Sequence, residues 1–146
     1  MSEFDYTQEE RFGRDITSKL YSSFFAVDDV TFIVGEEDTN VVEVNLQLVD
    51  LAGNPVPKSM VVTVHLSSDP DSIVVDATKG SMAIATGGAG TLVNETVAGG
   101  VASFQTDAEG KLDIALSDDS DLNVYMIVAL PSGDLATSSE IVFTAA

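Results

Sequence analysis

Residues 41–66 read VVEVNLQLVDLAGNPVPKSMVVTVHL, and this stretch holds two alternating runs separated by a turn. In the first run, the apolar residues at positions 42, 44, 46 and 48 alternate with polar ones, and residues 60–66 repeat the pattern. A period of two with one apolar face is typical of a half-buried β-strand. Gly53, Asn54 and Pro55 between the runs favour a turn, because glycine and asparagine tolerate positive φ and proline cannot donate to a ladder.

The same pattern continues beyond this stretch. Residues 112–116 and 122–130 alternate in the same way, and Tyr125 and Ile127 give the second run an apolar opposite face, so both of its faces are expected to be covered. Residues 107–110 and 131–134 carry turn chemistry, and the second turn predicts a hairpin. Shorter strands are predicted at residues 31–34, 72–75, 82–85, 101–106 and 141–144. The glycine-rich segment 87–100 is either a loop excursion or an edge hairpin with a strand at 92–97.

Strands with turns at intervals of about ten residues predict an all-β fold, an Ig-like antiparallel β-sandwich of seven or eight strands. The chain of 146 residues is 45% hydrophobic, which is enough for one packed domain. It has no cysteine, so disulfides and thiolate chemistry are excluded. Its net charge of −18 disfavours binding to nucleic acid or to an anionic membrane. No apolar run is long enough to span a membrane, and the first residues lack the apolar region of a signal peptide.

The first 25 residues differ from the rest of the chain. They hold three of the six basic residues and six of the ten aromatic residues. Thr7 and Glu10 fit a capping box, and apolar residues follow at positions 12, 16, 20 and 24, which is one stripe of a helix. The pattern predicts a helix over about residues 8–22, with residues 1–25 as an N-terminal arm and residues 26–146 as the sandwich.

A helix this short is only marginally stable alone in water, so its apolar stripe needs a protein surface on which to pack. The stripe packs either on its own sandwich or on another protein chain. Aromatic residues and arginine are enriched at the centres of protein interfaces, which favours the second alternative. The residues predicted to contact the partner are Phe4, Tyr6, Arg11, Phe12, Arg14, Ile16, Lys19, Leu20 and Phe24.

Little in the sequence indicates catalysis. His65 is the only histidine and lies within a predicted strand, and no G-x-S-x-G motif occurs. The acidic clusters follow no twelve-residue calcium loop, although residues 117–123 leave a partial oxygen cage to be weighed against a solvated acidic loop. The sequence therefore predicts a protein that is not an enzyme and that has no cofactor, metal or catalytic residue. The acidic clusters considered as calcium ligands lie at residues 28–29, 36–38, 69–71 and 118–121.

Two segments resemble known domains. Residues 44–69, VNLQLVDLAGNPVPKSMVVTVHLSSD, and residues 104–130, FQTDAEGKLDIALSDDSDLNVYMIVAL, are similar to bacterial Ig-like domains of the intimin and invasin group. Residues 80–93, GSMAIATGGAGTLV, and the ending VYMIVALPSGDLATSSEIVF at 124–143 resemble short Ig-like virion proteins of tailed bacteriophages. That family includes head decoration, or cement, proteins. The resemblance implies a structural role without catalytic residues, and this chain departs from single-module versions by its additional N-terminal residues.

The expected function is accordingly that of a capsid decoration protein. The arm would dock on the phage head, with the major capsid protein or another virion protein as partner, and the acidic domain would face solvent on the capsid surface. Neither nucleic acid nor membrane is an expected partner, and self-association as a dimer or trimer stays open. The alternative is a module associated with a phage tail or fibre, or with a bacterial surface, that binds host glycan or protein.

Overall fold

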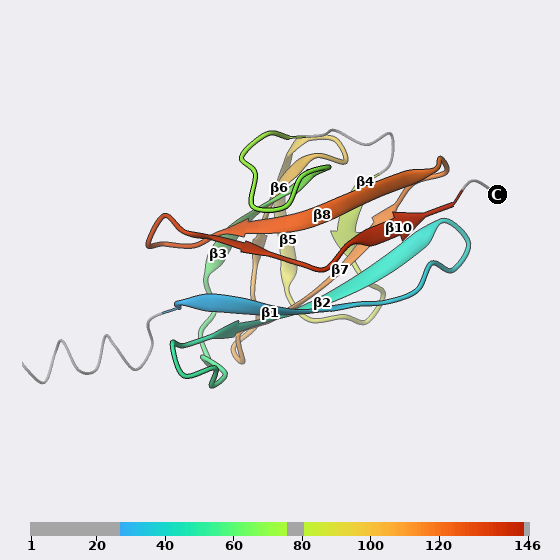
Figure 1. The fold of residues 1–146 in the computed structure, drawn as a ribbon. Helices are drawn as coiled ribbons and strands as arrows, with labels where there is room; N and C mark the ends of the chain where they lie inside the picture. The colour runs from blue at the N-terminus through green and yellow to red at the C-terminus, as the bar shows by residue number, and fades with distance from the viewer. Residues whose placement is uncertain (1–26, 76–80, 145–146) are drawn as a thin grey trace, which may run out of the picture.

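The computed structural model describes residues 27–75 and 81–144, which fold as two facing antiparallel sheets with no helix among them (Figure 1). One sheet has the strand order β1-β2-β7-β4, and the other has the order β10-β8-β3-β6-β5, with β9 paired to β8. The strands are β1 (Asp29–Val34), β2 (Val41–Val49), β3 (Val61–Ser67), β4 (Ser81–Ile84), β5 (Thr91–Val97), β6 (Val101–Gln105), β7 (Lys111–Ser117), β8 (Leu122–Ala129), β9 (Leu135–Thr137) and β10 (Ile141–Phe143).

The predicted all-β, Ig-like antiparallel β-sandwich is confirmed. The described residues form ten strands instead of seven or eight, because several short edge strands pair as well. The segment 92–97 is an edge strand, β5, in a hairpin with β6. Residues 131–134 connect β8 to β9 as a hairpin, as predicted.

One predicted strand is wrong and one strand was not predicted. Residues 72–75 lie in the connection from β3 to β4 and join no ladder. Their β-branched composition favours an extended chain, but no neighbouring strand is in place to accept their hydrogen bonds. The unpredicted strand, β9, has only three residues and too few alternations to be recognised in sequence.

The core lies between the two sheets and is built by the alternating runs. In β2 the even positions from Val42 to Leu48 are buried, while Glu43 points to solvent. Phe104 and Phe143 are among the largest fully buried side chains. Burial of a side chain of this size contributes about 2 kcal/mol, so each of these aromatics is a substantial single contribution to the core.

The outer face of β8 is also covered, as its sequence predicts. Ile127 is fully buried there, opposite the inward Met126. Its neighbour in β3 is His65, whose Nε2 lies 2.6 Å from the carbonyl oxygen of Ser72. The connection from β3 to β4 therefore crosses this face, and His65 holds it in place.

Three five-residue loops share one backbone geometry. They occupy residues 50–54, 107–111 and 130–134. In each, the N–H of the first residue donates to the carbonyl oxygen of the fifth, and the carbonyl oxygen of the first accepts the N–H of the fourth. The fourth residue is a glycine with positive φ, +85° at Gly53, +77° at Gly110 and +94° at Gly133. In the first two loops the leading residue is an aspartate, Asp50 or Asp107, whose Oδ1 accepts N–H groups two and four residues further on. The D-x-x-G pattern is therefore a structural signature of the loop.

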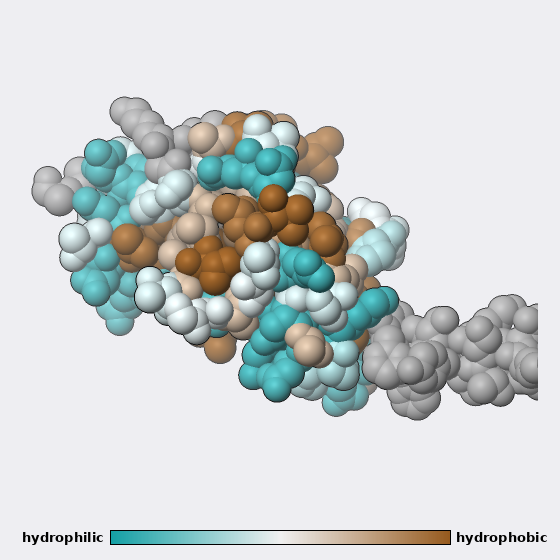
Figure 2. Space-filling view, turned by 180° about the vertical axis from the view of Figure 1, so that it is seen from behind, coloured by the Kyte–Doolittle hydropathy of each residue, from teal (hydrophilic) through white to brown (hydrophobic). Residues whose placement is uncertain are grey.

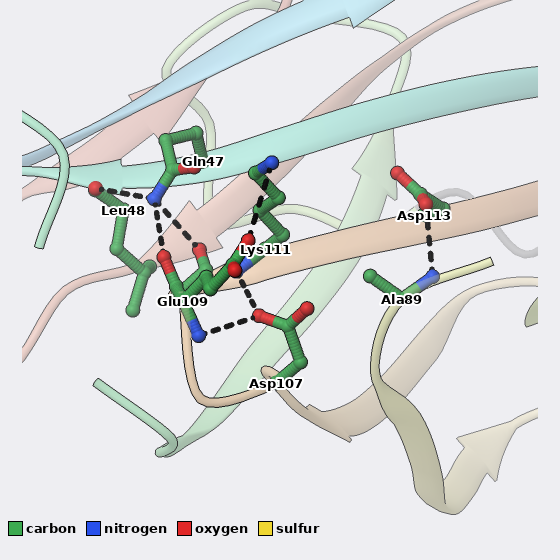
Figure 3. Close-up of polar contacts among 8 residues, drawn as sticks. Gln47, Leu48, Ala89, Asp107, Glu109, Lys111 and Asp113 are labelled. Atoms are coloured by element: carbon green, nitrogen blue, oxygen red, sulfur yellow. Dashed lines mark hydrogen bonds and ion pairs between the residues drawn. The ribbon is translucent and has the colours of Figure 1, made fainter. Parts of the chain in front are cut away.

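Side chains of β2 and β7 hold one of these loops, and also the glycine-rich segment before β5, against their sheet (Figure 3). The Gln47 Nε2 group donates to the carbonyl oxygens of Leu48, Glu109 and Gly110 at 2.9–3.2 Å, which fixes the turn between β6 and β7 against β2. Asp113 Oδ2 accepts the N–H of Ala89 at 2.8 Å, so the glycine-rich segment before β5 is held against β7. The Oδ1 atom of Asp113 accepts a hydrogen bond from the Asn45 Nδ2 group at 2.7 Å.

Glu95 joins the two sheets at the edge formed by β4 and β5. Its Oε2 accepts the N–H of Met82 in β4 at 3.1 Å and that of Gly99 at 2.9 Å. The carboxylate thereby pairs a backbone group of an edge strand that would otherwise lack a partner. A charged acceptor suits this position because charge-assisted hydrogen bonds are stronger than neutral ones.

Replacing Glu95 by alanine should lower the free energy of unfolding by about 1–3 kcal/mol, because two backbone N–H groups lose their acceptor. Urea unfolding followed by circular dichroism measures this. The matched control is Glu43→Ala, which removes an exposed glutamate of a central strand and should change stability by less than about 0.5 kcal/mol. Equal effects of the two substitutions would show that the Glu95 contacts do not stabilise the edge.

Candidate interaction surfaces

The predicted partner-binding residues and the predicted helix at 8–22 lie outside the described residues. Val27 is buried in the core, and the Asp28 N–H donates to the Val49 carbonyl oxygen at 3.0 Å. Residues 27 and 28 are therefore already part of the sandwich. The residues outside the description are Phe4, Tyr6, Arg11, Phe12, Arg14, Ile16, Lys19, Leu20 and Phe24.

Side chains of the acidic clusters accept hydrogen bonds within the body. Asp71 Oδ1 accepts the hydroxyl of Thr137, and Asp118 Oδ1 accepts the N–H of Ser120. Within residues 27–75 and 81–144, no three histidine, aspartate or glutamate side chains gather as metal ligands. No helix in the same residues is long and apolar enough to cross a membrane.

Several aliphatic side chains are exposed on this acidic molecule. The run Ile73-Val74-Val75 follows Asp71, and Ile73 is 80% exposed. On β5, Leu92, Val93 and Val97 face solvent. Figure 2 shows the molecule from behind, with apolar side chains gathered at the middle of the visible face and hydrophilic side chains around them. Exposed apolar runs of this kind are typical of contact surfaces.

A groove lies at the seam where β1 of one sheet approaches β10 of the other. This seam groove has a volume of about 470 Å³. Val34 and Val142 supply its apolar part, and Val142 is 46% exposed. The full lining is Val34, Gly35, Glu36, Glu37, Ser139, Glu140, Val142 and Thr144.

Glu37 bridges the two sides of the seam groove. Its Oε1 accepts both the N–H of Thr144 at 2.9 Å and the Thr144 hydroxyl at 2.8 Å. Its Oε2 is buried and has no hydrogen-bond partner among the described residues. In the sequence Glu37 is one member of the acidic cluster at residues 36–38, and its partner lies 107 positions away, so only the fold reveals the pairing.

Fold and composition together define the class of this chain, an acidic Ig-like β-sandwich. No protein-family model matches the chain, and no curated protein matches it. Among solved structures, a conjugative transposon lipoprotein from Bacteroides eggerthii is similar over 79% of this chain and 94% of that chain, with 15% identity and a TM-score of 0.43. A likeness of this degree assigns no function.

Proposed function

We propose that the protein is a structural component of a phage virion, a decoration protein that attaches to the head through residues 1–25. The observation that carries this proposal is the contrast between the arm and the body. Five of the 24 acidic residues and three of the six basic residues lie in the arm, so the body carries 19 acids against three bases. A nearly neutral, aromatic arm is suited to bury surface on a partner, and a polyanionic body is suited to remain in solvent.

The packing of the body supports this division. Its alternating strands place their apolar residues in a core between two sheets. Attachment by a short arm has modest affinity per copy. When several copies are linked to one another, binding to neighbouring sites on the shell raises the overall avidity. The resemblance to Ig-like virion proteins supplies the choice of a phage head as the partner.

The expected contact made by the apolar stripe of the arm can be tested by placing negative charges on the stripe. The double substitution Phe12→Asp and Leu20→Asp should reduce co-sedimentation with purified undecorated heads at least about tenfold, because it places two carboxylates at the centre of the expected contact. The matched control is Thr17→Asp with Ser18→Asp, which adds the same charge beside the stripe and should retain most of the binding. Both proteins should show the circular dichroism of a folded sheet protein.

Equal loss in the stripe variant and the control would point to charge alone and count against a helical contact. Electron microscopy of particles with and without the protein then locates it. Density on the head supports the proposal, and density confined to the tail supports a tail or fibre module instead.

A further inference from the structure

We propose that two copies of this chain associate face to face through the outer side of β3, β6 and β5. This side is called the uncharged face below. The inference concerns the body of the chain, and it holds whether or not the arm binds a phage head. The side chains that point outward from the three strands are Val61, Thr63, Thr91, Asn94, Val97, Val101, Ser103 and Gln105.

The uncharged face contrasts with the strongly acidic character of the body. Among the described residues, the strands of the six-stranded sheet hold one charged side chain, Glu95. Glu95 points towards the other sheet, where its Oε2 accepts the N–H of Met82, so it adds no charge to the outer side. In the four-stranded sheet, Asp29, Glu43 and Lys111 are exposed on three neighbouring strands. Charged residues are depleted at the centres of protein interfaces, which favours the uncharged face as a contact surface.

The uncharged face is accessible and partly apolar. Val61 at the start of β3 is 54% exposed. His65 is paired with Val101 across β3 and β6, and its Nε2 lies 2.6 Å from the carbonyl oxygen of Ser72. The next residue of the connection, Ile73, is 80% exposed, so a further apolar side chain borders the face. Apolar groups set among uncharged polar ones are suited to burial against another protein.

Charge also selects the occupant of the uncharged face. A foreign partner that recognises a polyanion is expected to carry basic groups that meet acidic ones, and the outward side chains of β3, β6 and β5 include no acid. A second copy presents the same uncharged face, and a two-fold arrangement brings each patch against its counterpart. The Thr63 hydroxyl and the Asn94 amide can both donate and accept hydrogen bonds, so a surface of such groups complements itself. Packing through this face keeps the exposed acids of the four-stranded sheets far apart, which limits their repulsion.

The dimensions of the uncharged face predict a weak dimer. Strands β3 and β5 have seven residues each and β6 has five. Three strands about 4.8 Å apart and about 23 Å long cover less area than the interface of a permanent dimer. We therefore expect a dissociation constant between about 10 and 500 µM.

Salt should strengthen this dimer. The contact contains no ion pair that salt could weaken, while the two acidic bodies repel each other, and that repulsion is screened as the Debye length shortens. Raising the sodium chloride concentration from about 20 mM to about 500 mM should tighten the dimer about tenfold. A contact made by ion pairs would respond in the opposite direction.

Sedimentation equilibrium of the full-length chain from about 5 µM to about 1 mM measures the association. Thr63→Glu places two like charges in the contact, one from each copy, and should weaken the dimer at least about tenfold. The matched control is Thr31→Glu, the same substitution at an exposed position of β1 on the outer side of the other sheet. It should leave the dissociation constant within about twofold of the unchanged protein, as expected for an exposed charge.

Two further measurements keep the result independent of misfolding. Both variants should retain the circular dichroism of a folded sheet protein. In the unchanged ¹⁵N-labelled chain, the amides that shift on dilution should be those of β3, β5 and β6.

Three outcomes would overturn the proposal. The chain could remain monomeric up to about 1 mM in about 500 mM salt, or the two variants could associate equally well. The shifted amides could also lie outside the uncharged face, which would place the contact on the arm or on the other sheet. None of these outcomes bears on attachment to heads, which is measured separately with the substitutions at Phe12 and Leu20.

Discussion

A chain that lacks residues 1–25 should fold like the full-length protein and should no longer bind heads. Val27 is buried in the core and the Asp28 N–H donates to the Val49 carbonyl oxygen, and the truncated chain retains both residues. We expect the free energy of unfolding to change by less than about 1 kcal/mol. Binding should fall by roughly 1,000-fold or more, because loss of two anchor side chains alone costs about 4 kcal/mol.

Two measurements on the truncated chain separate the alternatives. Thermal unfolding followed by circular dichroism reports the fold, and co-sedimentation with undecorated heads reports the binding. A truncated chain that unfolds at a much lower temperature would show that the arm packs on its own sandwich, which is the other placement that the sequence allows. A stable truncated chain that still sediments with heads would place the contact on the body.

Replacing Gly110 by alanine should destabilise the protein far more than the same change at Gly53. Both glycines occupy the fourth position of the same five-residue loop and both have positive φ. A Cβ at Gly110 would lie 2.1 Å from the Val56 carbonyl oxygen, whereas a Cβ at Gly53 meets nothing within 4 Å. The left-handed backbone costs an alanine about 1–2 kcal/mol at either site, and the collision at Gly110 adds about 1–3 kcal/mol.

Urea unfolding of the two variants, followed by circular dichroism because the chain has no tryptophan, gives the comparison. The midpoint should fall moderately for Gly53→Ala and strongly for Gly110→Ala, with an unchanged slope in both. Equal midpoints would mean that the turn between β6 and β7 moves freely away from Val56. Gly133→Ala is a second control, since its Cβ also meets nothing within 4 Å.

The long strands and their turns follow from sequence because both signals are local. Alternation over residues 42–48 specifies one buried face, and the D-x-x-G pattern supplies the aspartate acceptor and the glycine that the loop geometry needs. A one-residue shift in β2 would expose its whole apolar set, so the pattern alone determines the register of that strand.

The short elements depend on partners that no local pattern reveals. Residues 72–75 have the composition of a strand but find no neighbouring edge, while β9 pairs with β8 over only three residues because the hairpin holds it there. The helix predicted for the arm lies outside the described residues and stays a prediction.

The seam groove could not be predicted from sequence for a similar reason. Glu37 and Thr144 meet only because β1 and β10 are edge strands of facing sheets. In sequence, Glu37 belongs to a run of three acids that reads as a solvated loop, and nothing nearby distinguishes its buried oxygen.

The course of β2 has a practical consequence for engineering. Asp28 contacts Val49 at one end of this nine-residue strand, while Thr144 contacts Glu37 near the other, so the first and the last described residues lie at opposite ends of the body (Figure 1). The strand is about 30 Å long. A passenger protein joined beyond Thr144 would therefore start at the end of the body opposite Asp28, which suits the chain as a carrier for antigens or reporter enzymes.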